Sequence, residues 1–251
     1  MSSLHSFELA ATDGKLIRGD RSIGKDRQIL FITGFLSKRW GNKSKALVQW
    51  CEEKGWGFCC YDVRGFGESD GNFTDYTLSD WIADARTVLR TLDTGPPLTL
   101  VGNSLGGWIA WLMAQELEQI ERLVLIAPAF NMMGLRAKSI DPERRQTWQG
   151  NGWMPWDDEP AHRDWPLSWK WVEESEAYWK TSFDRLRHVS TTVLHGLQDS
   201  VILPGGSRQF VEQLLAKDAS FPVELNLITG DHRLGTSENM ERFHQLVVGQ
   251  P

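Results

Sequence analysis

An apolar run passes into a glycine-rich turn in the segment Leu98-Thr99-Leu100-Val101-Gly102-Asn103-Ser104-Leu105-Gly106-Gly107. The run up to Val101 is typical of a buried strand, and a helix is expected from about residue 105 to 117. Ser104 therefore lies on a tight strand-to-helix turn, which holds the hydroxyl above the sheet in a strained backbone conformation. Gly102 and Gly106 allow strand and helix to approach closely. This context predicts a nucleophilic serine; a tight structural turn is the alternative.

Strand and helix patterns alternate on both sides of this segment. The expected strands cover residues 28–33, 57–61, 98–101, 122–126, 192–195 and 223–228. The expected helices cover residues 42–54, 76–92, 105–117, 207–217 and 236–248. Such alternation requires crossover connections and predicts an α/β fold, with a mostly parallel sheet covered by helices on both faces.

Residues 130–189 interrupt this alternation. They show no strand run and contain turn-forming residues, and most of the chain's tryptophan excess lies among them. We expect residues 1–129 and 190–251 to form the core, and 130–189 to form a helical, Trp-rich cap. Seven of the 13 tryptophans lie here: Trp148, Trp153, Trp156, Trp165, Trp169, Trp171 and Trp179.

A nucleophilic serine needs a base that a carboxylate orients. His232 follows the final strand, at the edge where ligands bind in open parallel sheets. Asp199 follows the preceding strand at the same edge, and the order serine, acid, histidine is that of Gly-x-Ser-x-Gly hydrolases. Asp231 is the reserve acid, and His195, at the end of a buried strand, is expected to be a packed structural residue. The remaining histidines are His5, His162, His188 and His244.

Acyl transfer also requires donors for the oxyanion. The backbone N–H groups of Leu105, after the serine, and of Phe35, after the strand at 28–33, are the predicted pair. The Phe35 side chain is also a candidate for the acyl pocket, together with Trp153 and Trp156. Aromatic residues at helical spacing are more often core than ligand wall, so we expect one or two of the seven cap tryptophans to face the cleft.

The glycine-rich segment 62–69 is a different kind of motif. It lacks a Lys-Ser/Thr ending and does not open into a helix, which argues against a phosphate-binding loop. We expect a structural clamp in which Asp62 and Arg64 pair with each other or bond to the backbone.

Composition narrows the possible partners and the location. The formal net charge is −6 and the pI about 5.6, so no basic excess is available for nucleic acid. No apolar stretch approaches membrane-spanning length, and the N-terminus does not resemble a secretory signal. Cys51, Cys59 and Cys60 are expected to be buried free thiols, and the cytoplasm is the expected location.

With these residues placed, the chain resembles the α/β-hydrolase superfamily along essentially its whole length. More narrowly, it resembles the branch of the mitochondrial palmitoyl-protein thioesterases and mycophenolic acid acyl-glucuronide esterases, with their bacterial relatives. Its insert is richer in tryptophan than is typical of that branch, and it has no recognisable mitochondrial presequence. The matching segments are Thr33-Gly34-Phe35-Leu36-Ser37, Gly41-Asn42-Lys43-Ser44-Lys45-Ala46-Leu47, Ser69-Asp70-Gly71-Asn72, Ser104-Leu105-Gly106-Gly107-Trp108, His195-Gly196 with Asp199, and Asp231-His232-Arg233.

The resemblance implies hydrolysis of carboxylic esters or acyl thioesters, including those of S-acylated proteins, without metal or organic cofactor. It implies the same roles of nucleophile, acid and base for Ser104, Asp199 and His232. A carbon–carbon bond hydrolase or a lyase would use the same three residues, so both stay open as alternatives. A non-catalytic binding module on the same scaffold is the alternative outside the enzymes.

Overall fold

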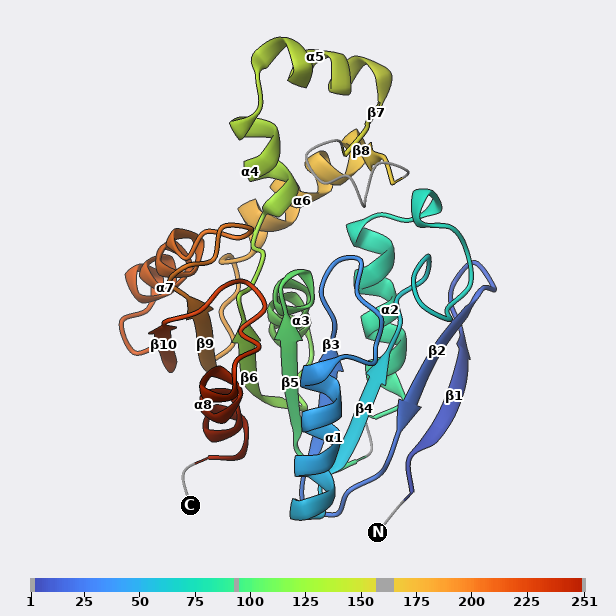
Figure 1. Cartoon of the computed structure of the whole chain (residues 1–251), viewed down its shortest axis with the longest axis vertical. Coiled ribbons are helices and arrows are strands. Elements are labelled where there is room, and N and C mark those ends of the chain that lie inside the picture. The colour runs from blue at the N-terminus through green and yellow to red at the C-terminus, as the bar shows by residue number, and fades with distance from the viewer. Residues whose placement is uncertain (1–2, 93–94, 157–164, 250–251) are drawn as a thin grey trace.

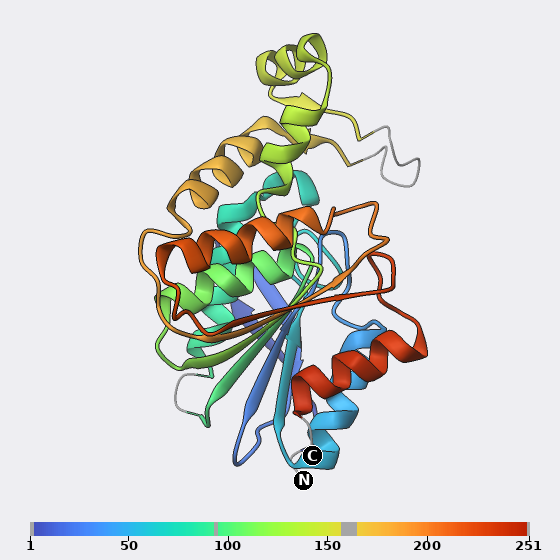
Figure 2. The ribbon, with the colours of Figure 1, turned by 90° about the vertical axis from the view of Figure 1, so that its left-hand side faces the viewer.

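The computed structural model describes residues 3–92, 95–156 and 165–249. One sheet of eight strands runs through this described part, strongly twisted from edge to edge (Figures 1 and 2). In spatial order its strands are β1 (His5–Ala10), β2 (Leu16–Arg21), β4 (Gly57–Tyr61), β3 (Gln28–Ile32), β5 (Leu98–Asn103), β6 (Ile120–Ile126), β9 (Ser190–Gly196) and β10 (Val223–Ile228).

Strand direction divides the sheet into two parts. From β4 to β10 every neighbouring pair is parallel, whereas β1 pairs antiparallel with β2, and β2 pairs antiparallel with β4. The predicted, mostly parallel α/β architecture is confirmed. The antiparallel pair β1–β2 at one edge adds two strands that the sequence patterns did not reveal.

Helices cover both faces of the sheet, as Figure 2 shows. One face carries α1 (Asn42–Lys54) and α8 (Ser237–Val248); the other carries α2 (Leu78–Arg90), α3 (Leu105–Glu116) and α7 (Gly205–Lys217). All five residues of β3 and all five of β4 are buried, because both strands lie between helix layers. Burial on both faces explains why these strands are continuous apolar runs rather than alternating ones.

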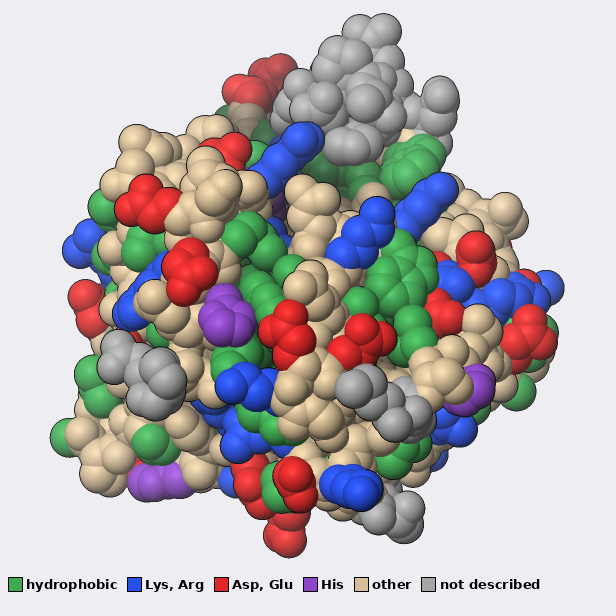
Figure 3. Space-filling view, turned by 60° about the horizontal axis from the view of Figure 1, so that its bottom comes forward, with side chains coloured by type: hydrophobic (Ala, Val, Ile, Leu, Met, Phe, Trp, Pro, Cys, Tyr) green, Lys and Arg blue, Asp and Glu red, His purple; other side chains and the backbone are tan. Residues whose placement is uncertain are grey.

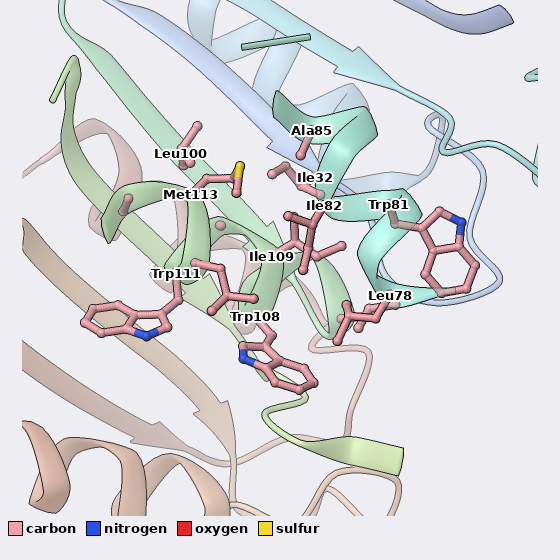
Figure 4. Close-up of a cluster of buried hydrophobic side chains, with 14 of the residues drawn as sticks. Ile32, Leu78, Trp81, Ile82, Ala85, Leu100, Trp108, Ile109, Trp111 and Met113 are labelled. Carbon is pink, nitrogen blue, oxygen red and sulfur yellow. The ribbon is translucent and has the colours of Figure 1, made fainter. Parts of the chain in front are cut away.

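The larger of the two cores lies between the sheet, α2 and α3 (Figure 4). Trp81 of α2 and Trp108 and Trp111 of α3 are all 0% exposed. Each such ring removes roughly 150–250 Å² from water. Three of the chain's tryptophans outside the predicted cap therefore stabilise the layer that carries Ser104.

Above the sheet in Figure 1 lie α4 (Met132–Ser139), α5 (Pro142–Asn151) and α6 (Trp169–Thr181). The segment also contains two short strands, β7 (Trp153–Met154) and β8 (Leu167–Ser168), which pair antiparallel although the sequence shows no strand run there. A short 3-10 helix at Phe73–Asp75 precedes α2. The division into a core and a cap stays a prediction.

Asp62 and Arg64 do not pair with each other, but the alternative expectation, bonding to the backbone, is confirmed for both: Asp62 accepts backbone N–H groups, and Arg64 donates to the carbonyl oxygen of Asp80. Asp62 instead binds Arg39, with Nη1 2.5 Å from Oδ2, and accepts the backbone N–H groups of Arg39 and Glu68. Arg64 pairs with Asp84 at 2.6 Å and with Asp13 at 2.9 Å. The segment is nevertheless structural, as expected, because its charged side chains fasten neighbouring strands and loops to one another.

Other expectations from composition concern the surface and the thiols. Acidic and basic side chains are interspersed over the face drawn in Figure 3. All three cysteines are free and buried, which confirms that prediction. No helix within the described residues is long and apolar enough to cross a bilayer.

Candidate active site

Ser104 lies between β5 and α3, at the carboxyl end of the parallel strands. Its backbone has φ 54° and ψ −120°, a strained conformation for a residue with a side chain. Four backbone hydrogen bonds hold it: its N–H donates to the carbonyl oxygen of Ile126, and its own carbonyl accepts the N–H groups of Gly107, Trp108 and Ala129. The predicted strand–turn–helix context of Ser104 is therefore present, and its side chain has a fixed position.

Gly106 is required by the close approach of α3 to β3. A Cβ atom at this position would lie 2.2 Å from the carbonyl oxygen of Ile32 and 2.4 Å from that of Thr33. Gly102 is similarly confined, because its Cβ would lie 2.4 Å from the carbonyl oxygen of Gly106. The glycines on both sides of Ser104 thus allow three backbones to meet directly beneath it.

His232 lies in the loop between β10 and α8 and faces Ser104. Its Nε2 is 3.2 Å from Ser104 Oγ, and its Nδ1 is 2.7 Å from Asp199 Oδ2. An ionised carboxylate only accepts hydrogen bonds, so Nδ1 carries the proton and Nε2 is left to accept one from the serine hydroxyl. This is the tautomer that a serine-activating base requires.

Asp199 is fully buried and remains ionised because donors surround it. Its Oδ1 accepts the backbone N–H groups of Val201 and Ile202, at 2.9 and 2.8 Å. Burial acts to raise the pKa of Asp199, but hydrogen bonds from His195, His232 and Ile202 outweigh it and hold that pKa well below its usual range. A charged, fixed carboxylate is therefore available to orient His232.

His195 contributes a contact that sequence reasoning missed. It is 0% exposed, as a packed residue should be, but its Nε2 lies 3.1 Å from Asp199 Oδ2 and 2.9 Å from the carbonyl oxygen of Ile202. Two acceptors at Nε2 require the proton there, and Nδ1 then accepts the hydroxyl of Ser207 at 2.7 Å. In the sequence, the four-residue spacing from His195 to Asp199 was the one signal that could have indicated this contact.

The loop after β3 approaches Ser104 closely. A Cβ added to Gly34 would lie 3.1 Å from Ser104 Cβ, so the backbone passes directly beside the serine, with Phe35 the next residue. Among the hydrogen bonds between described residues, neither the Phe35 nor the Leu105 N–H has a protein acceptor. Leu105 thus follows Ser104 in the chain, Phe35 follows a glycine that lies beside Ser104, and neither N–H group is engaged elsewhere in the described structure.

A pocket of about 620 Å³ opens onto Ser104 and His232. Its wall includes Phe35 and Trp156, whose rings stack with centroids 5.3 Å apart and planes 20° from parallel. The other lining residues are Leu36, Met132, Met133, Arg136, Ser200, Val201, Ile202, Asp231 and Arg233. The lining is mixed: apolar side chains alternate with the charged Arg136, Asp231 and Arg233, and the serine hydroxyl lies at the wall.

Trp153 was predicted to line the acyl pocket, and the structure places it elsewhere. It is 42% exposed and is not among the described residues that line the pocket. Successive side chains of a strand point to opposite sides, and in β7 it is Met154 that is buried. Trp153 is consequently directed to solvent, and Trp156 is the tryptophan of the predicted pair that reaches the pocket.

Other candidate residues occupy different positions. Asp231, the reserve acid, binds the backbone N–H groups of Arg233 and Leu234 rather than His232. His188 pairs with Asp218 on the surface, and His162 lies outside the described residues. Within the described ranges, no group of three or more His, Cys, Asp or Glu side chains is arranged to hold a metal ion.

This fold and site define a class of protein. The alpha/beta hydrolase family matches residues 30–246, and the chain belongs to this family. The family membership supports hydrolase activity.

Individual relatives narrow the comparison. The mitochondrial palmitoyl-protein thioesterase ABHD10 of Homo sapiens is 27% identical over 216 residues, which cover 84% of this chain and 68% of that protein. The solved structure of mouse alpha/beta hydrolase domain-containing protein 10 is 25% identical, with a TM-score of 0.83 and 97% of each chain covered. A putative hydrolase from Agrobacterium vitis is also 25% identical, with a TM-score of 0.86 over 99% of this chain and 98% of its own.

These relatives confirm the resemblance drawn from the sequence motifs. The ABHD10 proteins are named as mitochondrial, so a cytoplasmic location for this chain stays a prediction.

Proposed function

We propose that this protein is a serine hydrolase that cleaves carboxylic esters or acyl thioesters through an acyl-enzyme on Ser104. One observation carries the proposal: the hydroxyl of Ser104, the imidazole of His232 and the carboxylate of Asp199 form a continuous relay of 3.2 and 2.7 Å. The thioesterase names of its relatives support the same reaction class.

The reaction begins with proton transfer from Ser104 to His232. As the serine oxygen attacks the carbonyl carbon, Nε2 takes the hydroxyl proton, and the Asp199 carboxylate stabilises the imidazolium that forms. The imidazolium then protonates the leaving alcohol or thiol. Water then enters, gives a proton to the same imidazole and attacks the acyl carbon. As the bond to Ser104 breaks, the imidazolium returns that proton to Ser104 Oγ, and the acid is released.

Charge on the tetrahedral intermediate is stabilised by the N–H groups of Phe35 and Leu105. Leu105 begins α3, so the positive end of the helix dipole adds to its contribution. Loss of one oxyanion donor typically lowers the rate by ~10²–10³. These are backbone donors, so side-chain substitution at either position leaves the N–H in place.

The pocket beside Ser104 indicates an apolar acyl group. Phe35, Leu36, Met132, Met133 and Trp156 supply its apolar lining. The substrate is a small ester or thioester, or an S-acylated protein that presents its acyl chain to this pocket. In this proposal residues 1–129 and 190–251 form the catalytic core, and 130–189 form the cap that shapes the acyl site.

The test is covalent labelling combined with a substrate series. A fluorophosphonate should label the native protein and not the Ser104→Ala variant, and the same variant should lose hydrolysis of esters and thioesters. Ser200→Ala is the matched control, because Ser200 lines the same pocket, whereas the hydrogen bonds of His232 within the described structure go to Asp199 and Ser104. Unchanged hydrolysis in Ser104→Ala would refute the proposal, and turnover of a β-diketone with no turnover of any ester would favour the carbon–carbon bond hydrolase instead.

A further inference from the structure

The motif Gly41–Leu47 lies outside the proposed catalytic residues, and most of it has a local structural role. Gly41 is the N-cap of α1, and its N–H donates to the hydroxyl of Ser44, which is buried. Leu47 is 0% exposed in the core beneath α1. These contacts explain how the motif begins a helix. They leave the function of Lys43 in the first turn unexplained.

Lys43 contacts a segment that is distant in the sequence. Its ammonium donates to the backbone carbonyl oxygen of Arg233 at 2.5 Å, across 190 residues of chain. Arg233 directly follows His232. Figure 1 shows that the first turn of α1 and the loop before α8 lie at the same edge of the sheet.

The position is unfavourable for a cation. Partial burial lowers the pKa of Lys43 to about 8, although the nearby charge of Asp231 opposes that shift. A cation in the first turn of a helix is also repelled by the helix dipole. A contribution to stability therefore does not explain why this position is a lysine. Its contact with the His232 loop points to a role in the proposed active site.

The loop that carries His232 has several other supports. Asn239 donates to the carbonyl of Thr229 at 2.8 Å, and the N–H of Gln198 donates to that of Gly230 at 2.9 Å. Both of these hydrogen bonds hold residues that precede His232 in the loop. After His232, the Asp231 carboxylate binds N–H groups of its own loop. Among the described side chains of α1, Lys43 supplies the hydrogen bond to this second part of the loop.

The segment before α1 contains the Phe35 N–H. Residues 34–41 run from the proposed oxyanion donor to the helix that begins with Asn42. Lys43, in the first turn of α1, therefore links the helix that follows the oxyanion-donor loop to the loop that holds the base.

We propose that Lys43 is a positioning residue that fixes the His232 loop against the loop of Phe35. The inference rests on the proposed serine hydrolase function. With the ammonium in place, His232 Nε2 remains within reach of the Ser104 hydroxyl. Without it, the base loop shifts relative to the oxyanion donor, while the apolar wall formed by Phe35, Met132 and Trp156, which lie on other segments, stays intact.

The first test replaces the ammonium by a methyl thioether, Lys43→Met. Because small misplacements of reacting groups are costly, we expect kcat to fall about tenfold and KM to change by less than about twofold. Labelling of Ser104 by a fluorophosphonate should slow in parallel. Tm should stay within about 2 °C of native or rise, because a partly buried cation is removed. Lys45→Met, exposed on the same helix, is the matched control and should change none of these quantities.

Chemical rescue distinguishes the effect of losing the ammonium charge from the effect of disturbing the fold. Lys43→Cys treated with 2-bromoethylamine forms a thioether by displacement of bromide, which restores an ammonium at nearly the original length. Burial raises the pKa of Cys51 and of Cys59 to about 12 and that of Cys60 further, so these thiols resist alkylation. We expect kcat to fall in Lys43→Cys and to recover on alkylation.

The division of the effect between kcat and KM gives a readout that a purely structural role would not produce. Lys43→Met should lower kcat and leave KM nearly unchanged, Lys45→Met should change neither, and alkylation of Lys43→Cys should restore kcat alone.

Two results would overturn the proposal. One is a kcat and a labelling rate in Lys43→Met that both match the native protein. The other is a loss of activity that accompanies a lowered Tm and does not recover on alkylation. Failure of the proposed function is separate: the native chain would then not be labelled at Ser104, which would reject both inferences.

Discussion

His195 and Asp199 are hydrogen-bonded inside the protein, with Nε2 of the imidazole 3.1 Å from Oδ2 of the carboxylate. That same oxygen also accepts the Nδ1–H of His232 at 2.7 Å. Both His195 and Asp199 have fully buried side chains. The orienting carboxylate is thus itself oriented, by a histidine that does not contact Ser104.

Replacing His195 by phenylalanine should lower kcat by about tenfold, because outer partners of reactive groups commonly contribute 10–100-fold. The buried carboxylate loses one donor and can rotate away from His232, whereas the acyl pocket and KM are little affected. Steady-state kinetics on one ester measure kcat and KM separately. His188→Asn removes a surface His–Asp pair and should leave kcat unchanged; equal losses in the two variants would contradict the interpretation.

Asp199→Asn should lower kcat by about 10⁴, because the amide can donate to His232 and stabilise the wrong tautomer. Asp231→Asn should cost far less, since its remaining carbonyl oxygen can still accept the loop N–H groups. Burst and steady-state kinetics of the two variants compare the two carboxylates directly. A larger loss of kcat in Asp231→Asn than in Asp199→Asn would make Asp231 the acid that orients His232.

Asp199 should also affect stability in acid. Its pKa is lowered in the folded state relative to 3.8, so the unfolded chain binds the proton more readily. Its contribution is therefore present above about pH 4 and decreases as the pH falls below that value. Urea unfolding from pH 6 to pH 3 should show a native-minus-Asp199→Asn difference that shrinks in acid. A difference independent of pH would contradict this, and exposed Asp26→Asn provides the reference.

Trp156→Ala should reduce kcat/KM more for long acyl chains than for short ones. The indole forms part of the pocket wall, and each buried CH₂ of an acyl chain contributes about 0.8 kcal/mol when its apolar contacts are kept. Trp153→Ala is the matched control, because that ring is exposed and lies outside the pocket. Parallel losses at every chain length would show that Trp156 acts through folding rather than through the acyl site.

Gly106→Ala should destabilise the fold and displace Ser104. Its Cβ would meet two backbone oxygens that cannot move away, and overpacking of this kind costs about 1–3 kcal/mol or more. Gly150→Ala, in α5, meets no atom within 4 Å and should be neutral or stabilising by up to about 1 kcal/mol. Thermal unfolding compares the two, and a native-like Tm in Gly106→Ala would refute the close-approach argument.

Local sequence patterns were sufficient for the main architecture. Apolar runs and helical periodicity predicted the parallel strands and their covering helices, because each of these elements is buried on a defined face. The positions of Ser104, Asp199 and His232 followed from chain order, since loops after parallel strands meet at one edge. The structure brings these three side chains together.

Long-range pairing was the part that sequence could not supply. Asp62 and Arg64 were expected to pair with each other or to bond to the backbone. The backbone bonds are present, but the charged partner of Asp62 is Arg39, on a different loop. The buried status of His195 was predicted, whereas its contact with Asp199 depends on how the loop after β9 folds back. Short strands such as β7 and β8 carry too few residues to produce a recognisable period.

The stacking of Trp156 on Phe35 has an optical consequence. The two rings lie 5.3 Å apart at the pocket wall, so an acyl chain that enters must change the polarity around this indole. Indole emission depends on the polarity of its surroundings. The protein thus carries an intrinsic fluorophore at its proposed acyl site, and the difference in emission between native and Trp156→Phe would isolate that signal from the other 12 tryptophans of the 13. Occupancy by a non-hydrolysable acyl ligand could then be titrated without attaching a dye.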